Sequence, residues 1–298
     1  MLAGLGLVVT VGGIAWLVFS ASLGSGVASG WLLPGAITAA GGVVLLGSLG
    51  WLAERGVWAR QQLPEERYRG PSIILLFVLA VAAANVLSLP PLLADALAGG
   101  DLTEPSTFAL IVLLLVTPLI FGAVGALFVI RPRALVGARF GDGPATIRNV
   151  ARGVALGAAA WVAANAVAIA LAWLVTELTG EAPDEGQVVA EMAKTLPPLV
   201  AIALIGLLAP VAEEFFFRWI AVNAWEREHG TRVAVLGSAV LFGGAHILGG
   251  SWLALPSIIL LGVILAGAYV ATRSLPLVIG VHATFNCLSL AVIFLVPS

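Results

Sequence analysis

Charged residues are scarce in this chain, with 14 Lys and Arg and 16 Asp and Glu making up 10% of 298 residues. A soluble domain carries about 25% charged and about 45–50% apolar residues. Here the hydrophobic residues reach 60% even before the 35 glycines are counted. A soluble fold of this size leaves roughly a quarter of its chain surface exposed, so it could not cover that much apolar area. The composition excludes a soluble enzyme, a nucleic-acid binder and a disordered chain.

Several hydrolase motifs are also missing. The chain has one cysteine, Cys287, so no disulfide can form within it. No Gly-x-Ser-x-Gly sequence occurs, which disfavours a serine hydrolase of that type. None of the three histidines is followed by glutamate, so the His-Glu-x-x-His helix of zinc proteases is absent as well.

What the chain has in abundance is long apolar runs. A membrane-spanning helix needs about 20 mostly apolar residues. The sequence offers such runs at residues 3–21, 31–53, 72–94, 107–130, 153–175, 197–220, 232–248, 254–272 and 276–296. The first run lacks a basic region before it, so we interpret it as a retained helix and not as a signal peptide. We therefore predict an all-α, polytopic integral membrane protein with eight to nine transmembrane helices.

The basic residues predict an orientation, because loops rich in Lys and Arg stay in the cytoplasm. With nine alternating spans, every arginine falls on one side of the membrane, mostly in segments 54–70 and 131–152. The opposite loops, at 95–104 and 177–191, contain acidic residues and no arginine, and only Lys194 departs from the pattern. We therefore expect a cytoplasmic N-terminus.

Ionisable side chains inside membrane spans are costly and usually functional. The first five spans hold essentially none, whereas spans six, seven and nine each hold a polar cluster. The clusters are Glu213-Glu214-Phe215-Phe216-Phe217-Arg218, Phe242-Gly243-Gly244-Ala245-His246 and His282-Ala283-Thr284-Phe285-Asn286. One salt bridge would suffice to tie helices together, so the additional polar groups predict a chemical site.

Helical spacing gives the two adjacent carboxylates different surroundings. Glu214 and Arg218 are four residues apart and share a helix face, so they can form an ion pair. Glu213 is about 100° further round the helix and lacks that partner. Pro210, three residues earlier, can kink the helix and open space beside it. Glu213 is near the cytoplasmic end of span six, so we expect the active site to face the cytoplasm.

The same spacing pairs Phe242 with His246 and His282 with Asn286. A carboxylate base, a second proton-handling group and two hydrogen-bond donors can activate water and stabilise a tetrahedral oxyanion. We predict that Glu213 and His246 activate the water without any cofactor. We predict that His282 and Asn286 stabilise the oxyanion. A divalent metal such as zinc, held by Glu213, His246 and His282, is the alternative.

The motifs Glu-Glu-x-x-x-Arg (213–218), Phe-x-x-x-His (242–246) and His-x-x-x-Asn (282–286) resemble those of the CPBP family of intramembrane proteases. This family contains the CAAX prenyl endopeptidases and the Abi-like bacteriocin-processing or self-immunity proteins, and older descriptions treat it as metalloproteases. The resemblance implies a glutamate-type endopeptidase of a bacterial or archaeal cell membrane. Its substrate would be a membrane-associated peptide or protein. Lipidated, CAAX-like substrates are left open, and prenylated ones are not assigned to this chain.

Carried over by position, the resemblance implies the same roles for Glu213, His246, His282 and Asn286. It adds that Glu214 and Arg218 hold the first motif in shape, while Phe242 supports the second. We expect the protease core at residues 150–298 and N-terminal transmembrane helices of unknown role at residues 1–130.

Two other functions are compatible with intramembrane Glu and His. A proton-coupled transporter would use them as a proton relay. Transporters of this kind have interrupted helices in two symmetric halves. Here the ionisable residues are instead concentrated in the last four spans. A non-catalytic immunity or scaffold protein would keep the fold without turnover. The expected partners are membrane lipid and a membrane-associated substrate, with no nucleic acid.

Overall fold

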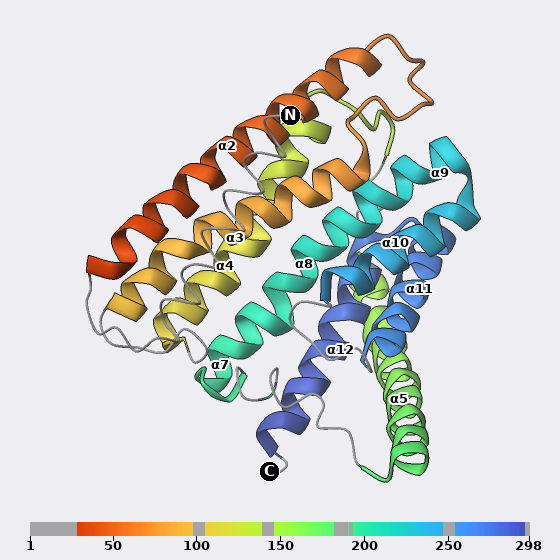
Figure 1. Cartoon of the computed structure of the whole chain (residues 1–298). Coiled ribbons are helices and arrows are strands. Elements are labelled where there is room, and N and C mark those ends of the chain that lie inside the picture. The colour runs from red at the N-terminus through yellow and green to blue at the C-terminus, as the bar shows by residue number, and fades with distance from the viewer. Residues whose placement is uncertain are drawn as a thin grey trace. The chain divides into compact units, whose positions relative to one another are not determined.

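The structure is a computed structural model that describes residues 29–97, 105–138, 146–181, 190, 193–246 and 254–295. Every regular element in these residues is a helix, as Figure 1 shows, which confirms the all-α prediction. The chain divides into two compact units. The first consists of Met1–Leu63 and Arg69–Ala134, and the second consists of Pro64–Tyr68 and Leu135–Ser298.

The first unit contains α2 (Ser29–Arg60), α3 (Ile73–Leu97) and α4 (Thr107–Gly125), which continues as the π-helix η1 (Ala126–Ile130). The helix α3 packs against both α2 and α4 (Figure 1). The Oγ of Ser106 caps α4 by accepting a hydrogen bond from the backbone N–H of Ala109. A turn follows η1, in which Arg133 takes a left-handed conformation with φ of 54°.

The second unit contains the helices that carry the polar clusters. In chain order they are α5 (Thr146–Thr179), α7 (Pro198–Ala201), η3 (Ile202–Leu208), α8 (Ala209–Glu214), η4 (Phe215–Val222), α9 (Asn223–His229), α10 (Thr231–His246), α11 (Leu255–Thr272) and α12 (Leu275–Leu295). The five segments from α7 to α9 follow one another without a break and form a single apolar span, Pro198–His229, in which η3 and η4 are π-helical.

The helix α12 lies at the centre of the second unit and packs against α5, η3, α8 and α11. Two glycines of α5, Gly153 and Gly157, let its backbone approach that of α12 closely. A Cβ atom on Gly157 would lie only 2.5 Å from the carbonyl oxygen of Val281, so no larger residue fits there without movement. Small residues spaced by four permit this kind of close helix packing in membranes.

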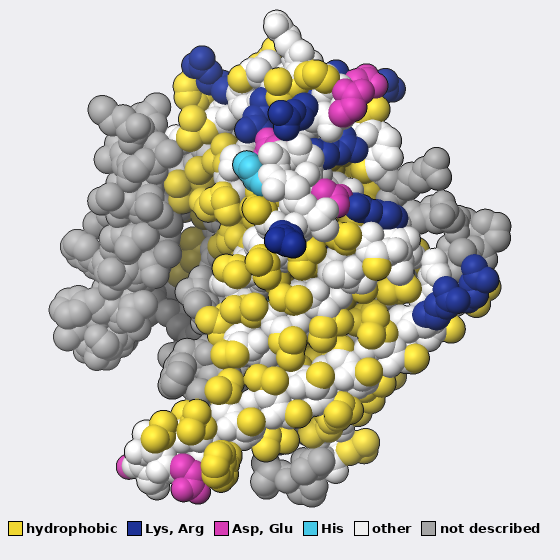
Figure 2. Space-filling model, turned by 90° about the vertical axis from the view of Figure 1, so that its right-hand side faces the viewer, with side chains coloured by type: hydrophobic (Ala, Val, Ile, Leu, Met, Phe, Trp, Pro, Cys, Tyr) yellow, Lys and Arg dark blue, Asp and Glu magenta, His cyan; other side chains and the backbone are white. Residues whose placement is uncertain are grey.

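Six helices of the described residues are long and apolar enough to cross a membrane. They are Ile73–Asp95, Thr107–Ile130, Ile147–Thr179, Pro198–His229, Leu255–Thr272 and Leu275–Leu295. Large hydrophobic side chains such as Val162, Ile169 and Trp173 on α5 point outward. The face in Figure 2 accordingly shows a broad field of hydrophobic side chains, with many of the charged ones gathered toward its upper end. These features make the chain an integral membrane protein.

The number of nine spans stays a prediction. The first expected span, residues 3–21, lies outside the described residues. Residues 98–104 and 182–189, which make up much of the two acidic loops, lie outside them as well. The second expected run falls in α2, which is not among the six helices above, and α10 is short for a span at 16 residues. The predicted run 107–130 coincides with Thr107–Ile130.

Candidate active site

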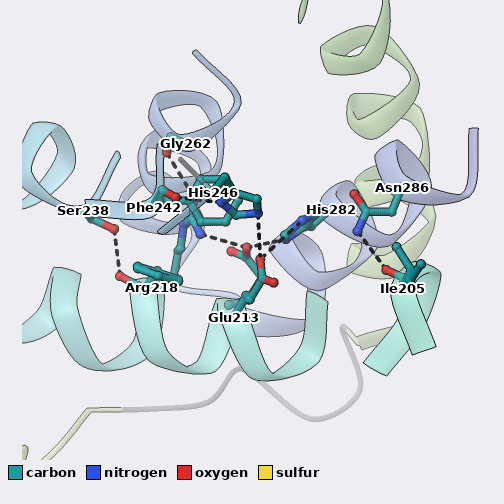
Figure 3. A network of polar contacts seen from close by, with 11 residues as sticks. Ile205, Glu213, Arg218, Ser238, Phe242, His246, Gly262, His282 and Asn286 are labelled. Atoms are coloured by element: carbon teal, nitrogen blue, oxygen red, sulfur yellow. Dashed lines mark hydrogen bonds and ion pairs between the residues drawn. The ribbon is translucent and has the colours of Figure 1, made fainter. Parts of the chain in front are cut away.

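The three polar clusters come together inside the second unit, at the junction of α8, α10 and α12 (Figure 3). The end of α8 carries Glu213 and Glu214, and the end of α10 carries His246. From α12, His282 points toward the two carboxylates, whereas Asn286 points toward Ile205 of η3. All seven residues singled out in the sequence therefore lie in one region.

The ion pair expected between Glu214 and Arg218 is present. Arg218 Nη1 lies 2.9 Å from Glu214 Oε1, and neither side chain is exposed. Arg218 Nη2 also donates to the carbonyl oxygen of Gly262 at 3.4 Å, and its guanidinium carbon lies 4.4 Å from the centroid of the Phe242 ring. Burial of an arginine requires such partners, because an unpaired buried charge is costly. This pair thus anchors α8 and η4 to α11 and α10.

Glu214 has a second partner that helix spacing did not reveal. His282 Nδ1 lies 2.8 Å from the same Oε1 atom, and the His282 side chain is only 3% exposed. Because a carboxylate accepts, His282 Nδ1 must carry the hydrogen of this bond. The bond fixes the His282 ring so that its other nitrogen, Nε2, lies on the side of Glu213.

Glu213 differs from Glu214 as the sequence predicted, since it has no cation at hydrogen-bond distance. Its Oε2 atom lies 3.9 Å from His246 Nε2 and 3.8 Å from His282 Nε2, which is too long for hydrogen bonds. This Oε2 is buried and has no hydrogen-bond partner among the described residues, although 27% of the side chain is exposed. A buried acceptor of this kind is expected to bind water or another small polar group.

The expected contact between Phe242 and His246 is also present, with ring centroids 4.7 Å apart. His246 Nδ1 lies 2.8 Å from the carbonyl oxygen of Phe242. A carbonyl can only accept, so Nδ1 carries the hydrogen and the Nε2 of a neutral ring is left as an acceptor. Phe242 also packs edge-on against His282 at 5.5 Å. Its ring therefore positions both histidines.

Asn286 makes a contact that the sequence motif gave no means to predict. Its Nδ2 donates to the carbonyl oxygen of Ile205 at 2.8 Å. In η3 the backbone N–H of Ala209 bonds to Leu204, and the next residue, Pro210, has no N–H to offer Ile205. The Asn286 amide therefore supplies the hydrogen bond that the π-helix and Pro210 together remove.

The donor set for a metal was tested on the same geometry. Among the described residues, no three His, Cys, Asp or Glu side chains form a group that could hold a metal ion as they stand. The candidate ligands Glu213, His246 and His282 are nevertheless neighbours around one oxygen atom.

Comparison with known protein families gives a match over residues 195–288, about a third of the chain, to the family described as type II CAAX prenyl endopeptidase Rce1-like. The matched range includes every candidate site residue, whereas α2 to α5 lie outside it. Neither the curated proteins nor the solved structures gave a match. The chain thus carries, at residues 195–288, a domain of the Rce1-like CAAX prenyl endopeptidases, which are a family of proteases.

Proposed function

We propose that the protein is a glutamate-type intramembrane endopeptidase that hydrolyses a peptide bond in a membrane-associated peptide or protein. The observation that carries this proposal is the buried, unpartnered Oε2 of Glu213, which lies between the Nε2 atoms of two histidines. A water molecule bound there would have a carboxylate to take its proton and an imidazole nitrogen to orient it. That is the requirement for general-base activation of water.

In the proposed reaction, Glu213 accepts a proton from water while the water oxygen attacks the carbonyl carbon of the substrate. His246 Nε2 accepts a hydrogen bond from the same water, because the hydrogen on Nδ1 is donated to the backbone carbonyl oxygen of Phe242. The proton then passes to the nitrogen of the leaving group as the carbon–nitrogen bond breaks. Each proton removed from water is thus accounted for without a further reactant.

The oxyanion of the tetrahedral intermediate needs hydrogen-bond donors. His282 can donate from Nε2 only as an imidazolium, since its Nδ1 hydrogen is already directed at Glu214. Glu214 thus has a role beyond holding Arg218, because it also fixes the orientation of the His282 ring. Asn286 uses one amide hydrogen on Ile205 and keeps the second for the substrate oxygen.

The family description supports peptides with a lipidated, CAAX-like end as the first substrates to test. The arginine-rich segments support a site that opens toward the cytoplasm of a bacterial or archaeal cell. A metal is not needed for the proposed steps. If one binds, Glu213, His246 and His282 would hold it, and it would supply a Lewis acid for the water.

The proposal is tested with Glu213→Gln, which keeps the shape of the side chain and removes the base. Cleavage of a quenched fluorescent lipopeptide in nanodiscs should fall by about 10²–10⁴-fold, the usual contribution of a general base. His282→Ala and Asn286→Ala should each lose about 10²–10³-fold. Glu228→Gln, in the same span and away from the site, is the matched control. Wild-type turnover by Glu213→Gln would refute the mechanism.

The metal alternative needs a separate measurement. The purified enzyme is incubated with a zinc chelator and assayed before and after zinc is added back. We expect unchanged turnover in both cases. Loss of activity in the chelator that added zinc restores would replace the metal-free mechanism by a zinc-dependent one.

A further inference from the structure

The first unit contains a cavity that the proposed protease function does not use. It has a volume of about 540 Å³ and lies between the C-terminal half of α2 and the end of η1. This volume is in the range of sites that bind small organic ligands, roughly 300–1,000 Å³. Its lining includes Gly50, Glu54 and Trp58 from α2, and Leu127, Phe128 and Arg131 from η1 and the turn after it.

The walls of the cavity are fixed by contacts between the two segments. Ala53 of α2 and Val129 of η1 are both buried, with 0% and 1% exposure. Gln61 Nε2 donates to the carbonyl oxygen of Pro132, which ties the end of α2 to the turn after η1. On the α2 side, a Cβ added to Gly50 would meet nothing within 4 Å, so this residue leaves the space beside it open.

The turn after η1 is also held by backbone hydrogen bonds. The backbone N–H of Arg133 bonds to the carbonyl of Ile130, and that of Ala134 bonds to the carbonyl of Val129. This is the Schellman pattern that ends helices, with Arg133 in the left-handed position where glycine is usual. The pattern holds Arg131 at the last turn of the helix, beside the cavity.

The cavity carries one charge of each sign. Glu54 and Arg131 both line it, and neither side chain has a hydrogen bond or ion pair within the described part of the chain. The rest of the lining is mostly apolar, from Val57, Trp58 and Leu127. A ligand that satisfies all of these groups has an anionic group, a cationic group and an apolar tail.

The expected position of the cavity in the membrane narrows the choice of ligand. Its two segments belong to the arginine-rich regions 54–70 and 131–152, which the sequence assigns to the cytoplasmic surface. Trp51 and Trp58 of α2 are 55% and 72% exposed, as is common for tryptophan at the level of lipid headgroups. The amphiphile available at that level is a phospholipid.

We propose that this cavity binds a phospholipid whose headgroup carries both a phosphate and a primary ammonium, as phosphatidylethanolamine does. Arg131 binds the phosphate through its guanidinium, which matches phosphate geometry. Glu54 accepts hydrogen bonds from the ammonium, which a quaternary choline group could not donate. The acyl chains lie along Trp58 and Leu127.

The experiment is a titration of the purified full-length protein with phosphatidylethanolamine, phosphatidylcholine and phosphatidylglycerol, with bound lipid counted by native mass spectrometry. The wild-type protein should bind phosphatidylethanolamine most tightly. Arg131→Ala should weaken all three lipids about tenfold or more, as expected when a charged hydrogen bond is lost. Glu54→Gln should weaken phosphatidylethanolamine alone and remove its advantage over the other two.

Arg133→Asn is the matched control, because it removes a charge two residues from Arg131 while asparagine tolerates the left-handed conformation. It should leave all three affinities unchanged. Equal binding of the three lipids by the wild-type protein, or a preference that survives Glu54→Gln, would overturn the proposal. Glu54 and Arg131 are both exposed, so their variants should fold normally, which thermal unfolding checks.

Discussion

At Glu214 a single oxygen, Oε1, receives hydrogen bonds from two different helices, from Arg218 at 2.9 Å and from His282 at 2.8 Å. The carboxylate is fully buried, so its charge is tolerated only because these donors surround it. Glu213, the preceding residue, has a carboxylate oxygen without any such donor. Two adjacent residues of the same type therefore have different surroundings, and only Glu213 has a carboxylate oxygen left for the reaction proposed above.

A first prediction concerns this buried pair. Arg218→Met or Glu214→Gln alone should lower the free energy of unfolding by about 3–5 kcal/mol, because each removes the oppositely charged partner of a buried charge. The double variant should be more stable than either single variant, since no charge is left unpaired. Thermal unfolding in detergent measures all three. A double variant whose loss equals the sum of the single losses would contradict this account.

Sequence reasoning at the residue scale succeeded where partners lie on the same helix. The pairs Glu214–Arg218 and Phe242–His246 followed from the rule that residues four apart share a face, and both contacts are present. The bonds from His282 to Glu214 and from Asn286 to Ile205 join residues 68 and 81 positions apart. Such contacts depend on how the helices pack against one another, and a single sequence does not reveal that packing.

At the scale of elements, the π-helix η3 and Pro210 together create a weak point next to Glu213. The carbonyl of Ile205 has lost its backbone donor and depends on Asn286. We predict that Asn286→Ala costs about 1–3 kcal/mol of stability, the penalty of an unsatisfied polar group. Pro210→Ala restores an N–H at position 210, so the same Asn286→Ala change should cost less in that background.

The two backgrounds are compared by thermal unfolding and by cleavage. The stability loss should shrink in the Pro210→Ala background, whereas the loss of turnover should persist if Asn286 also binds the oxyanion. Strictly additive losses of stability would mean that Pro210 is not the reason why Asn286 contacts Ile205.

The contact between α5 and α12 gives a third prediction. Gly157→Ala should destabilise the protein by about 1–3 kcal/mol, the usual cost of overpacking, because the new methyl group meets the backbone oxygen of Val281. It should also lower turnover, since α12 carries His282 and Asn286. Gly267→Ala on α11 is the control, because nothing lies within 4 Å of its added methyl. Equal stability of the two variants would argue against close packing.

Hydropathy predicted where most helices begin and end, because the apolar runs and the helices share the same physical cause. The run 254–272 became α11 (Leu255–Thr272), and 276–296 became α12 (Leu275–Leu295). The π-helical segments η3 and η4 were not predicted. A change in hydrogen-bond register leaves the hydrophobicity of the segment unaltered, so no sequence pattern signals it.

At the scale of the whole molecule, the distribution of arginine predicts the topology. In a Cys287→Ser background, which has no other cysteine, a single cysteine is placed at Gln62 or at Glu181. On intact cells a membrane-impermeant maleimide should label the cysteine at position 181, and the one at position 62 only after permeabilisation. The reverse pattern would invert the orientation and move the expected active site to the outer surface.

The glycines of α5 determine which part of the chain a folded fragment must contain. A fragment limited to the family-matched residues 195–288 would lack α5 altogether. The backbone groove of α12 from Leu277 to Val281 would then lie open to lipid, which fills it far less well than a closely packed helix. The minimal folding piece of this protein should accordingly start before Thr146, even though no candidate site residue occurs in the added stretch.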